Sequence, residues 1–226
     1  VTNAQKRMGI STEQPSLSAQ SILQIWTEAV SDSSSRPAFT CLGQTLSYGE
    51  VDQLSRRVAS YLQKRLKLRA GDRIAIQLPN LIQYPVVAIA AMKLGLVIVN
   101  TNPMYSVREL VHQFNDAGVK AVIVLDQFYD VLSEAASQTS VEHVIVTRPL
   151  DLMPSSKRVL LGGLMRLMGK SPRIKNPDVI DFKDLIAGGT SYSNHRASLN
   201  DICALQYTGG TTGASKGVML TQSSLT

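Results

Sequence analysis

Between Gly71 and Thr147 the sequence alternates short apolar runs with amphipathic segments, and this alternation constrains the fold more than any other feature. Runs rich in Val, Ile and Leu predict strands at residues 74–78, 97–100, 121–125 and 143–147. Helical spacing of apolar residues predicts helices at about 82–94, 106–116 and 128–137. Strands that alternate with helices favour parallel pairing. We therefore predict an α/β fold with an open, mainly parallel sheet and helices on both faces.

The sequence before this region predicts a helix, a hairpin and a second helix. Residues 1–16 are polar and aperiodic, so we expect a disordered terminus. Apolar spacing predicts a helix from 17 to 30, and strands at 38–41 and 45–47 suggest a hairpin. Two capping boxes, in which a serine and a glutamate satisfy the first N–H groups of a helix, begin at Ser47 and Ser106. The first predicts a helix to about residue 66.

Composition excludes several classes of protein. The chain has 226 residues, 44% hydrophobic and 18% charged, which is typical of a globular protein with a sizeable core. Cys41 and Cys203 lie far apart and near no histidine cluster, which argues against a disulfide framework or a zinc site and fits a reducing compartment. The first thirty residues lack the basic-then-apolar pattern of a signal peptide, and Lys93 and Gly95 interrupt the longest apolar stretch. We therefore expect a cytoplasmic location.

The net charge of +6 is concentrated in one segment, residues 152–176, which we interpret as a basic amphipathic insertion. It contains no acidic residue and these cations: Lys157, Arg158, Arg166, Lys170, Arg173 and Lys175. Leucines and methionines alternate with the cations and would share one face of a helix. Two interpretations stay open: a helix packed on the domain, or a peripheral contact with an anionic membrane surface. The lack of aromatic residues argues against nucleic acid.

A stretch rich in glycine and threonine near the C-terminus predicts a loop that binds phosphate. Its glycines let backbone N–H groups turn inward, and its hydroxyls and lysine suit phosphate oxygens. The residues concerned are Thr208, Gly209, Gly210, Thr211, Thr212, Gly213 and Lys216. Ser215, not glycine, precedes the lysine, so the stretch is not a Walker-type P-loop. Predicted strands flank about nine loop residues, more than the two to five of most hairpins, which argues against a plain turn.

This loop and other stretches resemble known sequences. Residues 207–217, Tyr-Thr-Gly-Gly-Thr-Thr-Gly-Ala-Ser-Lys-Gly, resemble the phosphate-binding signature of adenylate-forming enzymes, which include acyl-CoA synthetases, luciferases and peptide-synthetase adenylation domains. The stretches that resemble bacterial long-chain fatty-acid–CoA ligases are 77–80, 83–86, 99–105 and 112–120. The resemblance covers most of residues 17–226 and implies the N-terminal portion of the large domain of such enzymes. It divides that portion into a parallel α/β subdomain, 71–147, and the loop with the start of a second subdomain, 202–226.

The resemblance also implies a reaction. A long-chain fatty acid carboxylate would attack the α-phosphorus of ATP to give an acyl-adenylate, and coenzyme A would then displace AMP. Such an attack requires the phosphate charge to be neutralised in advance. By resemblance Thr208 and Lys216 are catalytic, and Thr208 also contacts Mg²⁺. The residues implied in ATP binding are Tyr207, Thr208, Gly209, Gly210, Thr211, Thr212, Gly213, Ala214, Ser215, Lys216 and Gly217.

The chain departs from the family at a few positions. Ala214 and Ser215 replace a pair that often ends in proline or alanine, and Gln222 replaces a histidine. The adenine, fatty-acid and coenzyme A sites would lie beyond Thr226, so we expect a truncated fragment that is inactive alone. A non-catalytic nucleotide- or membrane-binding module is the alternative.

Other features have structural interpretations. The three histidines, His112, His143 and His195, do not cluster, which favours surface or packing roles over ligation. Residues 188–195 are linker-like in composition. We expect unpaired strand edges near 38–47, 205 and 218, which would favour self-association, for example as a homodimer.

Overall fold

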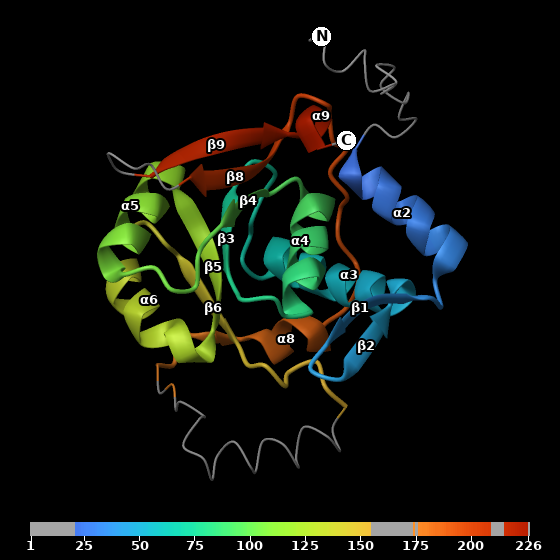
Figure 1. The fold of residues 1–226 in the computed structure, drawn as a ribbon, viewed down its shortest axis with the longest axis horizontal. Coiled ribbons are helices and arrows are strands. Elements are labelled where there is room, and N and C mark those ends of the chain that lie inside the picture. The colour runs from blue at the N-terminus through green and yellow to red at the C-terminus, as the bar shows by residue number, and fades with distance from the viewer. Residues whose placement is uncertain (1–20, 155–173, 175, 209–214, 226) are drawn as a thin grey trace, which may run out of the picture.

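The computed structural model describes residues 21–154, 174, 176–208 and 215–225. In these residues a seven-stranded sheet has the strand order β7-β6-β5-β3-β4-β8-β9 (Figure 1). Its strands are β3 (Arg73–Gln77), β4 (Val97–Asn100), β5 (Val119–Leu125), β6 (His143–Thr147), β7 (Ile180–Asp181), β8 (Ile202–Thr208) and β9 (Lys216–Thr221). All neighbouring strands are parallel except β8 and β9, which are antiparallel. The predicted open, mainly parallel sheet is confirmed. The terminus 1–16 and most of the basic segment lie outside the described residues.

The helices follow the sequence pattern closely. They are α2 (Ile22–Ser33), α3 (Tyr48–Lys64), α4 (Gln83–Leu94), α5 (Val107–Ala117), α6 (Tyr129–Ala136), α8 (Phe182–Ala187) and α9 (Gln222–Leu225), with a 3₁₀ turn η1 (Asp126–Phe128). Both predicted capping boxes form, at the starts of α3 and α5. Helices α4 and α5 end at Gly95 and Gly118, whose φ angles of 67° and 61° are left-handed conformations that glycine adopts without steric cost.

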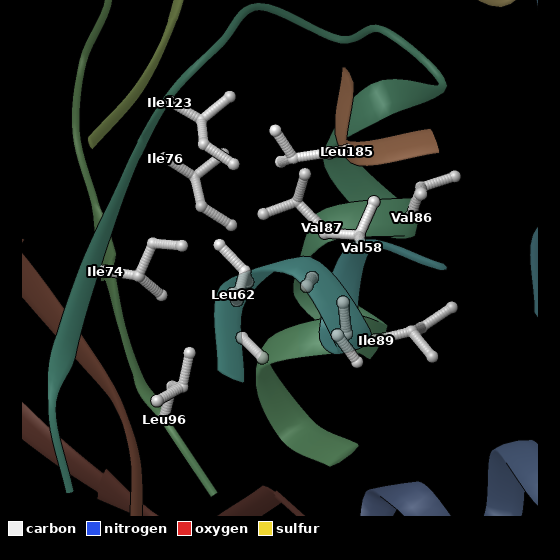
Figure 2. Close-up of a cluster of buried hydrophobic side chains, with 14 of the residues drawn as sticks. Val58, Leu62, Ile74, Ile76, Val86, Val87, Ile89, Leu96, Ile123 and Leu185 are labelled. Carbon is white, nitrogen blue, oxygen red and sulfur yellow. The ribbon is translucent and has the colours of Figure 1, made fainter. Parts of the chain in front are cut away.

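Helices cover both faces of the sheet, as predicted, and each face has its own apolar core. One core lies between the sheet and α3, α4 and α8, and Figure 2 shows its side chains interdigitating: Val58, Leu62, Ile74, Ile76, Val86, Val87, Ile89, Leu96, Ile123 and Leu185. The other core lies under α5 and α6, on the side seen at the left of Figure 1. The alternation of side chains along each strand produces this division: Ile74 and Ile76 face the first core and Ala75 faces the second.

A buried ion pair joins the helices of the first face. The ammonium of Lys93 on α4 lies 2.6 Å from Oδ1 of Asp52 on α3, and it also donates to Oγ of Ser55 at 2.8 Å. The indole N–H of Trp26 on α2 donates to the same carboxylate oxygen at 3.1 Å, and Nε of Arg56 donates to the other oxygen at 2.6 Å. Burial alone would raise the pKa of Asp52, but the hydrogen bonds from Lys93 and Arg56 lower it overall.

The predicted hairpin also forms. Strands β1 (Pro37–Cys41) and β2 (Gln44–Ser47) are antiparallel, and Leu42 and Gly43 make the turn with φ angles of 50° and 73°. Two positive φ angles are typical of the tight turns that match the twist of the strands. Within the described part of the chain, these two strands pair only with each other. The expectation of unpaired edges is therefore confirmed here.

The expectation of an unpaired edge near residue 205 is wrong. Strand β8 pairs with β4 in parallel, with Val99 opposite Leu205, and with β9 on its other side. The physical reason is burial: Ala204 contributes to one core and Tyr207 to the other, so β8 belongs inside the sheet. Residues 202–221 therefore continue the sheet of residues 73–147. Strand β9 is one edge of the described sheet and β7 is the other, and the β9 side chains Val218 and Met219 are 46% and 65% exposed.

The linker-like segment that leads into β8 is attached to the helices rather than running free. Its backbone accepts hydrogen bonds from Ser60 and Gln63 on α3, at Ser191 and Ser193. Further along, the backbone N–H of His195 donates to the carbonyl of Lys93 at 2.9 Å. These contacts fix where β8 begins. Among the described residues, the helices are too short or too polar to cross a lipid bilayer.

Candidate functional site

The predicted phosphate loop connects the carboxyl end of β8 to the start of β9. Thr208 and Lys216 are opposite each other in the antiparallel register, so they form the two sides of the loop base. Residues 209–214, which include most of the predicted contacts, lie outside the described residues. The carboxyl ends of β3 and β4 lie at the same edge of the sheet, because both strands run parallel to β8 or to its neighbour. This edge is where ligands bind in open α/β sheets.

Tyr207 connects the loop base to α5. Its side chain is buried, and its hydroxyl donates a hydrogen bond to Oδ2 of Asp116 at 2.5 Å. Burial raises the pKa of this hydroxyl strongly, and the hydrogen bond and negative charge of Asp116 raise it further. The hydroxyl therefore remains a protonated donor at physiological pH. The structure gives Tyr207 a positioning role; direct contact with ATP stays a prediction.

The lack of a side chain at Gly217 leaves room for the ring of Tyr207. It is the register partner of Tyr207, and a Cβ at this residue would lie 3.0–3.2 Å from ring and hydroxyl atoms of Tyr207. Such contacts are closer than ordinary van der Waals distances, so a side chain here would displace the ring. The last glycine of the motif therefore has a packing reason that does not involve phosphate.

A second contact from α5 holds the other side of the loop. Nε2 of His112 lies 2.9 Å from the backbone carbonyl oxygen of Ser215, and because a carbonyl only accepts, the imidazole donates from Nε2. His112 and Asp116 are four residues apart and therefore share one face of the helix. One helix thus contacts Tyr207 on β8 and Ser215 just before β9, on the two sides of the loop base. From the sequence His112 is expected to be a surface or packing residue, and Asp116 carries no distinguishing signal.

The side chains of Thr208 and Lys216 are exposed at this edge. Within the described part of the chain, no carboxylate forms an ion pair with the Lys216 ammonium. The loop base therefore presents a hydroxyl and a positive charge side by side, with their backbones fixed by sheet pairing. This arrangement suits an anion with several oxygens.

Comparison with known proteins identifies the family. The family described as AMP-binding enzyme matches residues 26–226. The chain belongs to the AMP-binding enzymes. A long-chain-fatty-acid–CoA ligase of Haemophilus influenzae is 38% identical over 91% of this chain, and one of Salmonella typhimurium is 37% identical over 89%. The chain spans 37% and 36% of the lengths of these two relatives.

Solved structures share the fold. An anthranilate–CoA ligase in complex with anthranoyl-AMP superimposes with a TM-score of 0.74 and 18% identity, over 89% of this chain and 35% of that structure. A luciferase-like enzyme from Zophobas morio gives a TM-score of 0.73 and 18% identity, over 93% of this chain and 44% of that one. The fold of this chain is therefore that of the N-terminal region of adenylate-forming enzymes.

In this AMP-binding chain, a row of polar side chains continues from the loop base along the same edge. The hydroxyl of Tyr84 on α4 donates to Oδ1 of Asn100 at 2.6 Å, and Nδ2 of Asn100 donates to Oε1 of Gln206 at 2.9 Å. On the opposite face, Nε2 of Gln113 on α5 donates to the backbone carbonyl of Asn100 at 3.0 Å. Asn100 begins the Asn-Thr-Asn-Pro stretch, so that part of the resemblance has a structural role beside β8.

Gln222, the position where the family usually has histidine, lies away from the loop base. It is buried at the start of α9, and its Oε1 accepts from the backbone N–H of Ile22 at 3.3 Å. Its own N–H donates to the carbonyl of Asp201 at 3.0 Å. Gln222 therefore connects the chain after β9 to the beginning of α2, which lie side by side in Figure 1.

Proposed function

We propose that this chain is the N-terminal part of a long-chain fatty-acid–CoA ligase that activates its substrate with ATP through an acyl-adenylate. The observation that carries the proposal is the loop base, where Thr208 and Lys216 are paired across two strands and α5 contacts Tyr207 and Ser215 on its two sides. Membership of the AMP-binding family supports adenylate chemistry. The names of the relatives that are 37–38% identical support a fatty acid as the substrate and coenzyme A as the acceptor.

In this proposal the residues of the chain bind and orient the triphosphate. The Lys216 ammonium neutralises oxygens of the β- and γ-phosphates, and the Thr208 hydroxyl contacts the same group from the other side of the loop. Sheet pairing holds both backbones before ATP arrives, so little reorganisation accompanies the attack of the fatty acid carboxylate. Tyr207, Gly217 and His112 act through the backbone, by fixing the loop base on α5.

Mg²⁺ belongs to the same proposal. The Thr208 hydroxyl is an oxygen ligand of the kind that Mg²⁺ accepts, and its exposure at the loop base leaves room for phosphate oxygens and waters as further ligands. In the described part of the chain, no cluster of three or more His, Cys, Asp or Glu side chains offers a metal cage. Among the described residues, Thr208 is the ligand that we propose for Mg²⁺. When bound, the metal would neutralise phosphate charge.

A peripheral contact with the inner face of the membrane remains a proposal from the sequence. It rests on the cations and leucines of the basic segment, of which residues 155–173 and 175 lie outside the described residues. A cytoplasmic location and a homodimer are likewise proposals that rest on the sequence.

The test is ATP–pyrophosphate exchange with palmitate, measured on the full-length gene product. We expect exchange that depends on palmitate, and we expect Thr208→Ala and Lys216→Ala each to lower it at least about tenfold, because one positioned donor typically contributes ~2.7–4 kcal/mol. Lys64→Ala is the matched control, since Lys64 is an exposed cation on α3. No palmitate-dependent exchange in the wild type would exclude the proposed function. Normal exchange in both loop variants would exclude only the phosphate role.

A further inference from the structure

Gln206 lies two residues before Thr208 on β8 and projects from the same face of the sheet, because side chains alternate along a strand. That face is the one covered by α4, since Ala204, two residues earlier still, belongs to the core on that side. Two residues of a strand span roughly 7 Å, so a ligand at the loop base would lie within reach of the exposed Gln206 side chain.

The direction of the hydrogen bonds through Asn100 determines which part of the Gln206 amide is free. The Tyr84 hydroxyl carries one proton and donates it to Oδ1 of Asn100 at 2.6 Å. Burial raises the pKa of this hydroxyl, so it stays a donor. Nδ2 of Asn100 then donates to Oε1 of Gln206 at 2.9 Å. Within the described residues, Nε2 of Gln206 has no hydrogen-bond partner. The oxygen of this amide is therefore occupied, and its N–H groups are free to donate.

The backbone of Asn100 is held on three sides, so the direction of these hydrogen bonds is fixed before a ligand arrives. Asn100 is opposite Gln206 in the parallel register of β4 and β8, and opposite Ile76 on β3. From α5, Nε2 of Gln113 donates to its backbone carbonyl at 3.0 Å. Hydrogen bonds in a chain polarise one another, which makes the last N–H a stronger donor. A pre-oriented donor two residues from the loop base suits an anionic oxygen.

We propose that Nε2 of Gln206 donates a hydrogen bond to an anionic oxygen of the substrates bound at the loop base, and that Asn100 and Tyr84 are positioning residues that act through it. The inference rests on the proposed function and deepens it. The oxygen belongs to the fatty acid carboxylate or to an ATP phosphate, which share this chemistry. The site thereby extends from the loop to β4 and α4.

The experiment measures palmitate-dependent ATP–pyrophosphate exchange by the full-length gene product, with kcat and KM determined for each substrate. Gln206→Glu keeps an acceptor for Asn100 but puts a negative charge in place of the free N–H groups, whereas Gln206→Met removes both. We expect kcat/KM to fall about tenfold in Gln206→Met and further in Gln206→Glu, because the carboxylate also repels an anion. Gln53→Glu, at an exposed glutamine on α3, is the matched control and should leave exchange unchanged.

The positioning role has its own readout. Asn100→Leu should lower kcat/KM in the wild type but cause little further loss in Gln206→Met, because Asn100 acts through Gln206. A rise in the KM of palmitate would assign the contact to the carboxylate, and a rise in the KM of ATP would assign it to a phosphate. A fall in kcat alone would show that the contact forms in the transition state.

A merely structural role of Gln206 would reverse the order of the two variants, because Gln206→Glu still accepts the hydrogen bond from Asn100. Exchange near the wild-type level in Gln206→Glu would therefore overturn the proposed contact. Additive losses in Asn100→Leu and Gln206→Met would overturn the positioning role. If Lys216→Ala loses exchange while both Gln206 variants retain it, this inference alone fails. No exchange in the wild type would exclude the proposed function and this contact with it.

Discussion

At the scale of single residues, the ring of Tyr207 explains why a glycine occupies position 217. Replacement by alanine brings a methyl group to 3.0–3.2 Å from the Tyr207 side chain. We expect Gly217→Ala to lower the free energy of unfolding by about 1–3 kcal/mol, the usual cost of overpacking. Gly188→Ala is the control, because nothing lies within 4 Å of its added Cβ. Urea unfolding checks both variants, and equal stability of the two would show that the ring moves freely.

The sequence indicated the loop but not the residues that hold it. Glycine, threonine and lysine in this order are a local signal, and the strands on either side were predicted because their apolar runs are local as well. The contacts of Asp116 with Tyr207 and of His112 with Ser215 span 91 and 103 residues. Their only signal was a spacing of four residues on a predicted helix. Nothing in the sequence says which strand that helix face will contact.

At the scale of elements, the buried Asp52–Lys93 pair joins α3 to α4, and Trp26 attaches α2 to the same carboxylate. Asp52→Asn removes the negative charge that pairs with the almost fully buried Lys93 ammonium and leaves it neutral acceptors, such as the hydroxyl of Ser55. Lys93→Met leaves Asp52 with Arg56 and Trp26. We therefore expect Asp52→Asn to cost about 3–5 kcal/mol of stability and Lys93→Met to cost less.

The same pair predicts a dependence on pH. The folded pKa of Asp52 is lowered, so its contribution to stability is present above its unfolded pKa of about 3.9 and is lost as pH falls through the folded pKa. The difference in stability between the wild type and Asp52→Asn should therefore shrink below about pH 4. Asp32→Asn, at an exposed position on α2, is the control and should show a small difference at every pH. If the difference in the free energy of unfolding between the wild type and Asp52→Asn stayed constant from pH 7 to pH 3, this account would be contradicted.

Elements whose limits are set locally were predicted well. Ser47 with Glu50 and Ser106 with Glu109 start α3 and α5 at the predicted residues, because capping is a contact over three residues. The segment around Ser193 was predicted as a linker from its composition, yet Gln63 holds it on α3 through two hydrogen bonds of 3.0 and 2.8 Å. Composition predicts the lack of regular structure but not attachment to another element.

At the scale of the whole molecule, the prediction that helices cover both faces of the sheet is confirmed. The prediction of an unpaired edge near residue 205 is wrong. Alternating strands and helices determine that helices cover both faces. They do not determine whether β8, about a hundred residues after β4, joins the same sheet. Burial of side chains on both faces of β8 places it inside, between β4 and β9. The edge of the described sheet on this side is consequently β9, and β7 is the opposite edge.

This strand order predicts unequal protection of the two strands that carry the loop. Backbone N–H groups of β8 bond to neighbours on both sides, as do those of β3 and β5, whereas β9 has one neighbour among the described residues. Exposed side chains on β9 leave its hydrogen bonds open to water, and such edges exchange and associate readily. In hydrogen exchange on the monomeric 226-residue chain, we expect amides of Leu205 and Tyr207 to be as slow as those of Ile76 and Val122. The amide of Met219 should exchange much faster. Equal protection of β8 and β9 in a monomer would show that β9 is covered, and rapid exchange throughout β8 would contradict its place in the sheet.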